Sequence, residues 1–194
     1  MKSLKDFEEL NNIQELVEKN EWEIIEECFK NLCIRIAGEE FVVLINQLDF
    51  SNYKAELEVK LLEAIQIAND KGAKAIYYSY DQNRNWNAAF LICNDYTKGK
   101  DVEKPSDEDW ASRWCREVKV ECFEEAYDIY EMSKGFFSKK YIGVTLYIAS
   151  IIMRELKDII KKLDIGNLSI CMHFMILKND IAMFDDIVRL IEKL

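Results

Sequence analysis

The chain has 194 residues and a net charge of −10, with 36 acidic residues against 26 basic ones. This length predicts that residues 1–194 form a single domain. The acidic balance argues against nucleic acids and anionic membranes as partners, because both are bound mainly through Lys and Arg. One proline and six glycines argue against a β-sandwich or a barrel, which need many tight turns.

The sequence predicts a soluble cytoplasmic protein. The first ten residues, MKSLKDFEEL, carry early acidic residues and lack the apolar run of a signal peptide. The longest apolar stretch, Tyr141 to Met153, is shorter than the roughly 20 residues that span a bilayer. None of the six cysteines has CxxC spacing, so we expect reduced thiols rather than disulfides.

Apolar residues at helical spacing cover most of the chain. Trp22, Ile25 and Phe29, for example, recur on one helix face, and Gly38 follows the end of that segment. We expect six to seven helices, at residues 3–19, 21–36, 51–69, 107–116, 122–133, 138–163 and 180–194.

Four other segments have the pattern of strands. They are residues 41–47, 74–80, 88–93 and 168–177. The first is predicted because Phe41 to Ile45 is short, rich in β-branched residues and apolar on both faces. The second and third are joined by a loop rich in Asn and Asp, which predicts a hairpin. The sum is a helix-rich α+β domain with about four strands and helices on one or both sides of the sheet.

The negative charge is concentrated in two blocks. Residues 1–50 hold 12 acidic and 5 basic residues, a net charge of −7, and residues 101–134 hold 11 and 5, a net charge of −6. The acidic residues of the N-terminal helices fall largely opposite the apolar stripe. They are interpreted either as a solvated helix face or as a docking face for a basic protein.

The second block contains acidic residues beside two tryptophans. Asp107, Glu108 and Asp109 precede Trp110, and Trp114 follows four residues later, on the same face of the expected helix. Aromatic rings among carboxylates are typical of a binding patch that selects a cationic partner. The alternative is a short helix whose tryptophans pack into the core and whose acidic residues stabilise its N-terminus.

The loop of the predicted hairpin is a third candidate contact site. It begins at Asp81, and Arg84 and Trp86 are its candidate anchors. The alternation of Asp81, Asn83 and Asn85 is similar to a calcium loop, but Trp86 stands where an EF-hand requires glycine, so an EF-hand is excluded. The alternative is that Trp86 folds back onto the sheet.

No nucleotide-binding, metalloprotease or hydrolase motif is present. His173, the single histidine, lies beside Cys171 in an apolar run, which fits a core position better than a metal ligand or a catalytic base. We expect no metal, no cofactor and no catalytic residue. An enzyme with carboxylate or tyrosine acid–base groups stays an alternative, and it requires a deep polar pocket beside Tyr78, Asp81 or His173.

One part of the chain resembles small uncharacterised bacterial proteins, some of which serve as immunity proteins in toxin systems. The similarity spans about residues 75–130 and is carried by YYSYD at 77–81, NW at 85–86, FLIC at 90–93, Tyr96 and DWASRW at 109–114. The resemblance implies a binding protein without catalytic residues. The leading hypothesis is an immunity or antitoxin-like protein that occludes a basic toxin domain, such as a nuclease. A homodimer formed through an apolar face of the 138–163 helix is another alternative.

Overall fold

The computed structural model describes residues 16, 19, 21–94, 114–135 and 139–174. Their elements are, in chain order, α2 (Trp22–Ile36), α3 (Glu39–Asn46), α4 (Ser51–Lys71), β1 (Ala75–Asp81), β2 (Asn87–Cys93), β3 (Trp114–Val120), α6 (Glu124–Ser133), α7 (Lys140–Ile160) and β4 (Ser169–Phe174). The α+β class and a sheet of four strands are confirmed, and three of the four predicted strands, at 74–80, 88–93 and 168–177, correspond to β1, β2 and β4. The described part holds five helices rather than six to seven. The expected helix at 180–194, and all but residues 16 and 19 of the one at 3–19, lie outside it.

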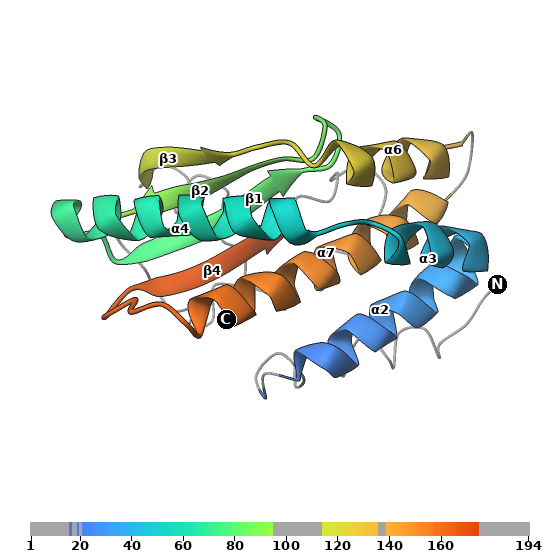
Figure 1. Ribbon diagram of the computed structural model, residues 1–194, viewed down its shortest axis with the longest axis horizontal. Coiled ribbons are helices and arrows are strands. Elements are labelled where there is room, and N and C mark those ends of the chain that lie inside the picture. Colours follow the sequence, from blue (N-terminus) through green and yellow to red (C-terminus); the bar gives the residue numbers. More distant parts are fainter. Residues whose placement is uncertain (1–15, 17–18, 20, 95–113, 136–138, 175–194) are drawn as a thin grey trace, which may run out of the picture.

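The four strands form one mixed sheet in the order β3-β2-β1-β4 (Figure 1). β1 and β2 form the predicted antiparallel hairpin, with Tyr78 opposite Phe90. β2 also pairs antiparallel with β3, and β1 pairs parallel with β4. A parallel pair needs a long crossover between its strands. Here that connection includes β2, β3, α6 and α7.

Helix α4 covers one face of the sheet (Figure 1). Along β1 the side chains of Ile76, Tyr78 and Tyr80 are buried, and those between them are only partly buried. This alternation is typical of a strand with one face in the core. The Tyr78 hydroxyl makes a hydrogen bond of 2.7 Å with the Tyr53 hydroxyl of α4, so the buried face of β1 is the one that meets α4.

Helix α7 is the centre of the helical part. Every residue from Ile142 to Met153 is buried, and α2, α3, α4 and α6 all contact this helix. A helix that is buried on all sides needs no polar face, which explains the long apolar run in its sequence. The apolar residues that the homodimer alternative assigned to an exposed face are therefore covered within the chain. None of the described helices combines the length and apolar character needed to cross a bilayer.

The strand predicted at 41–47 is wrong, because these residues belong to helix α3. Phe41, Val42 and Ile45 are buried while Val43 is exposed, a spacing that fits one turn of helix rather than the two-residue period of a strand. Gly38, with a φ of 113°, comes directly before the helix, and Glu39 and Glu40 occupy its first turn. Short apolar runs do not distinguish the two structures by composition alone.

The helix predicted at 107–116 is also wrong where the structure describes it. Residues 114–116 lie in strand β3. Val118 and Val120 are buried on this strand, and Glu117 and Lys119 between them are exposed. That alternation is the strand period. Trp110 lies outside the described residues, so the structure does not place the two tryptophans on a common helix face.

Candidate functional site

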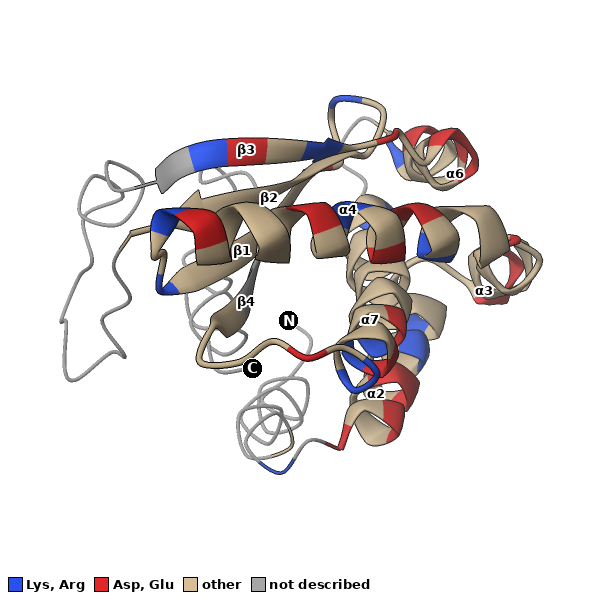
Figure 2. Ribbon diagram, turned by 60° about the vertical axis from the view of Figure 1, so that its left-hand side comes forward, with Lys and Arg blue, Asp and Glu red and all other residues tan. Residues whose placement is uncertain are grey.

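Helices α3 and α6 contact each other and bring residues from both acidic blocks of the sequence to one end of the molecule (Figure 2). Six exposed carboxylates lie on these two helices, and neither helix contains Lys or Arg. We call this set the α3–α6 acidic surface. Its members are Glu39, Glu40, Glu124, Glu125, Asp128 and Glu131.

The periodicity of each helix places these carboxylates outward. On α6, the buried residues Ala126, Ile129, Tyr130 and Ser133 recur at helical spacing and leave the acidic positions on the opposite side. Four of the six carboxylates stand in the first turn of their helix, where the helix dipole favours negative charge. Part of the acidic pattern therefore stabilises the helices themselves.

Two large apolar side chains are exposed among the carboxylates. Val43 of α3 is 53% exposed and Met132 of α6 is 63% exposed. Val43 follows Glu39 by one helical turn, and Met132 follows Asp128 in the same way, so each apolar side chain lies on the acidic face of its helix. Methionine is enriched in protein interfaces relative to the rest of the surface.

Only the margin of the surface is neutralised by lysines. Lys134 pairs with Glu131, and Lys140 pairs with Glu40 at 3.5 Å. The hydrogen bond from Lys134 lowers the pKa of Glu131. Within the described ranges, no ion pair involves the other four carboxylates of the surface. The centre of the surface therefore keeps its negative charge, and its field extends into solvent.

The hairpin loop lies against α6. The Tyr130 hydroxyl donates a hydrogen bond of 2.6 Å to the Asn83 side-chain oxygen. Arg84 is 80% exposed and pairs with Asp81 at 3.5 Å, so these two predicted contact residues are accessible beside the acidic surface. Trp86 is fully buried, stacked on Tyr80 and edge-on to Tyr130. In this structure Trp86 is therefore packed in the core, as the alternative of a tryptophan folded onto the sheet expected.

Asp107, Glu108, Asp109 and Trp110 lie outside the described residues, and Trp114 begins strand β3. The residues found only in the structure are Val43 and Met132. A helical-wheel reading of each segment could have found them, since both stand among charged positions of an amphipathic pattern.

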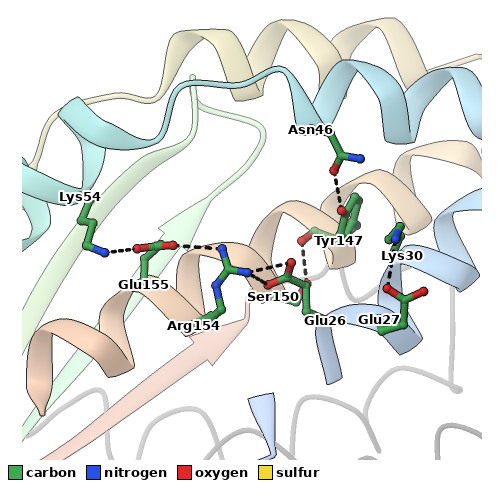
Figure 3. A network of polar contacts seen from close by, with 9 residues as sticks. All are labelled: Glu26, Glu27, Lys30, Asn46, Lys54, Tyr147, Ser150, Arg154 and Glu155. Carbon is green, nitrogen blue, oxygen red and sulfur yellow. Dashed lines mark hydrogen bonds and ion pairs between the residues drawn. The ribbon is translucent and has the colours of Figure 1, made fainter. Parts of the chain in front are cut away.

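A second set of carboxylates lies in the interior of the helical part, in a network that joins α2, α4 and α7 (Figure 3). The Arg154 guanidinium contacts a carboxylate oxygen of Glu26 at 2.8 Å and one of Glu155 at 3.0 Å, and Lys54 pairs with Glu155. The carboxylates of Glu26 and Glu155 are 18% and 15% exposed. These ion pairs connect helices and leave little of either carboxylate for a ligand.

The pKa values of the two glutamates in this network shift in opposite directions. Burial raises the pKa of Glu26, and the charge of Arg154 offsets this only in part. Burial also disfavours the charged form of Glu155, but hydrogen bonds from Lys54 and Arg154 outweigh it and lower the pKa of Glu155. Hydrogen bonds from two cationic donors therefore stabilise the Glu155 carboxylate, whereas the attraction of Arg154 and Lys30 does not offset the burial of Glu26 and the repulsion from Glu155.

Tyr78, one of the residues proposed as an acid–base group of an enzyme, lies in the core. Tyr78 is fully buried, and burial raises its pKa well above the usual tyrosine value, so its hydroxyl stays protonated at neutral pH. A shallow hollow of about 670 Å³ lies instead on the outer side of α4, lined by residues between Leu62 and Asp70. Among the described residues, no three His, Cys, Asp or Glu side chains are grouped to hold a metal ion.

Comparison of the chain with protein-family models, curated protein sequences and solved structures gave no significant match. The α3–α6 acidic surface and its neighbours are therefore the features that point to a function.

Proposed function

We propose that this protein is a cytoplasmic bacterial immunity or antitoxin-like protein that binds a basic toxin domain, such as a nuclease, and blocks it by occlusion. The observation that carries the proposal is the α3–α6 acidic surface. Its two helices carry six exposed carboxylates and no basic residue, and Val43 and Met132 supply exposed apolar contacts. Charge selects a cationic partner, and apolar contacts slow its dissociation.

Occlusion needs no chemistry from this chain. A nuclease holds its polyanionic substrate with Lys and Arg side chains. Carboxylates such as Glu124, Glu125 and Asp128 would pair with those cations and displace the substrate. The uncompensated field of the surface would attract the partner over a distance and raise the association rate. Arg84 and Asp81 lie next to α6 and belong to the edge of the proposed interface.

The acidic segment with Trp110 stays part of the proposal as a second contact. Asp107, Glu108 and Asp109 precede Trp110 in the sequence, in the same acidic block as α6. The proposal predicts that variants in this segment weaken partner binding less than variants in α6. The reason is that α6 contributes to a surface that α3 extends.

A capture experiment tests the proposal. The tagged full chain is used as bait for proteins of the native host, with the triple variant Glu124→Gln/Glu125→Gln/Asp128→Asn in parallel. We expect the wild-type chain to capture a basic protein and to suppress its toxic activity. We expect the triple variant to lose both effects. Capture of no basic protein would contradict the proposal.

A matched control separates a specific surface from net charge alone. Glu23, Glu63 and Asp70 are exposed carboxylates outside α3 and α6. The control Glu23→Gln/Glu63→Gln/Asp70→Asn removes the same number of charges from α2 and α4. We expect this control to capture the partner as the wild type does. Equal loss in both triple variants would show that bulk charge, not the α3–α6 acidic surface, attracts the partner.

A further inference from the structure

The turn between β1 and β2 has an unfavourable backbone. Asn85 and Trp86 both have a φ of 54°, in the left-handed region. The Asn87 N–H donates a hydrogen bond of 2.9 Å to the Arg84 carbonyl and closes the turn. Two consecutive positive φ values are usual in tight hairpin turns, but the second position then favours glycine. A bulky side chain such as that of Trp86 is strained there.

The same turn buries two polar atoms without hydrogen-bond partners. Trp86 is fully buried and Gln82 is 3% exposed. The indole Nε1 of Trp86 and the side-chain oxygen of Gln82 have no hydrogen-bond partner among the described residues. A buried polar group that loses water without gaining a partner destabilises the conformation that buries it. Both effects, backbone strain and lost hydrogen bonds, therefore disfavour the closed turn.

Contacts with Tyr80 and α6 hold this turn closed. The Trp86 ring stacks on Tyr80 with ring centroids 5.4 Å apart, and its edge meets Tyr130 at 6.2 Å. The Tyr130 hydroxyl also donates a hydrogen bond to Asn83, within the turn. Tyr130 belongs to α6, the helix that carries four of the six carboxylates of the acidic surface. The turn is thus closed by the same helix that the proposed partner would contact.

We propose that the turn from Gln82 to Trp86 is a latch with two states. In the closed state Trp86 is buried between Tyr80 and Tyr130. In the open state the backbone of the turn relaxes, and the indole Nε1 of Trp86 and the side-chain oxygen of Gln82 form hydrogen bonds with water. The indole is then accessible beside α6. A cationic partner that covers the indole would select the open state and gain an aromatic anchor. The anchoring step depends on the proposed function, but the two states belong to the chain alone.

Fluorine NMR of the full chain labelled with 5-fluorotryptophan tests the latch without any partner. The chain has four tryptophans, and a Trp86→Phe variant assigns the signal of Trp86. We expect relaxation dispersion at Trp86, which reports exchange between two states on the microsecond-to-millisecond timescale. Trp22, buried at the α2–α7 contact with a 1% exposed side chain, is the internal control and should show none.

Two conservative variants should move the equilibrium in opposite directions. Tyr130→Phe keeps the ring but removes the hydrogen bond to Asn83, so the open population should rise roughly fivefold. Gln82→Met removes the unpaired oxygen at similar size, so the open population should fall by a similar factor. Absence of dispersion at Trp86 in both the wild type and Tyr130→Phe would overturn the latch. A latch confirmed in the free protein together with a failed capture would refute only the proposed function.

Discussion

Two regions of this molecule use the same residue type for opposite purposes. In the network of α2, α4 and α7, the carboxylates of Glu26 and Glu155 are less than a fifth exposed, and each contacts Arg154. On the α3–α6 acidic surface, Glu124, Glu125 and Asp128 are exposed, and none makes an ion pair within the described part of the chain. The net charge of −10 therefore does not distinguish the paired, partly buried carboxylates from the unpaired, exposed ones.

The two groups of carboxylates differ in whether each one is paired with a cation or exposed to solvent. A partly buried carboxylate must be paired, because desolvation without a cation is costly, and the pair then connects the elements that supply it. An exposed, unpaired carboxylate contributes little to stability but adds to the field outside the protein. Variants in the first region should therefore change stability, and variants in the second should change binding. The predictions below test this separation, from the largest expected effect to the smallest.

Arg154→Ala should have the largest effect on stability. It removes the cation shared by Glu26 and Glu155 and leaves two poorly exposed carboxylates close together. We expect a loss of about 2–3 kcal/mol in the free energy of unfolding, measured by urea denaturation. Lys60→Ala is the control, since its pair with Glu63 is more exposed and should contribute less than about 0.5 kcal/mol. Equal losses in the two variants would contradict the account.

Gly143→Ala tests the apolar contact between α2 and α7. A Cβ atom at this position would lie 3.0 Å from the Cys33 Cα of α2, tighter than most packed Cβ contacts, and this neighbour is backbone rather than a flexible side chain. Glycine to alanine inside a helix normally stabilises by up to about 1 kcal/mol. Here we expect a destabilisation of about 1–3 kcal/mol in urea unfolding because α2 must move away from α7. A stabilised variant would show that the helices are not in close contact at this point.

The pH dependence of stability should distinguish the two glutamates of the network. The lowered pKa of Glu155 means that its contribution is complete above the ordinary value of 4.5 and is lost as pH falls through the lowered value. The raised pKa of Glu26 gives the opposite sign: its contribution is complete below 4.5 and is lost as pH rises through the raised value.

Urea unfolding at a series of pH values measures this difference. Relative to the wild type, Glu155→Gln should be more destabilised at neutral pH than in acid. Glu26→Gln should follow the reverse trend and be less destabilised at neutral pH than in acid. Parallel trends in the two variants would show that the second donor, Lys54, does not distinguish Glu155 from Glu26.

The smallest change in stability should come from the α3–α6 acidic surface. The triple variant Glu124→Gln/Glu125→Gln/Asp128→Asn loses favourable contacts with the α6 dipole but also loses mutual repulsion. We therefore expect its free energy of unfolding to stay within about 1 kcal/mol of the wild-type value. A loss as large as that of Arg154→Ala would mean that these carboxylates hold the fold and are not free to bind a partner.

Elements with a long periodic pattern were predictable from the sequence. The pattern over 51–69 predicted α4, and the turn chemistry of residues 81–87 predicted the hairpin. The prediction of a strand at 41–47 failed because an apolar run of five residues fits a buried helix as well as a strand. At 114–120 the four-residue spacing of two tryptophans indicated a helix, whereas the alternation of charged and apolar residues from Glu117 to Val120 indicated the true strand.

The candidate site was only partly predictable. Charge counting located two acidic blocks, but their contact through α3 and α6 is a tertiary feature that no local pattern contains. The burial of Trp86 is likewise a tertiary feature that the local sequence did not indicate. Its place in a polar loop indicated exposure, yet the aromatic stack with Tyr80 and the contact with Tyr130 of α6 bury it. Long-range packing decided both outcomes.

The most direct test of the central claim is the salt dependence of partner association. The association rate of the captured partner should be measured by stopped flow between about 50 mM and about 500 mM NaCl, where the screening length shortens severalfold. We expect the rate for the wild-type chain to fall steeply with salt, and the triple variant Glu124→Gln/Glu125→Gln/Asp128→Asn to bind more slowly with a shallower slope. Equal rates and equal slopes for the two proteins would contradict the assignment of the α3–α6 acidic surface as the docking site.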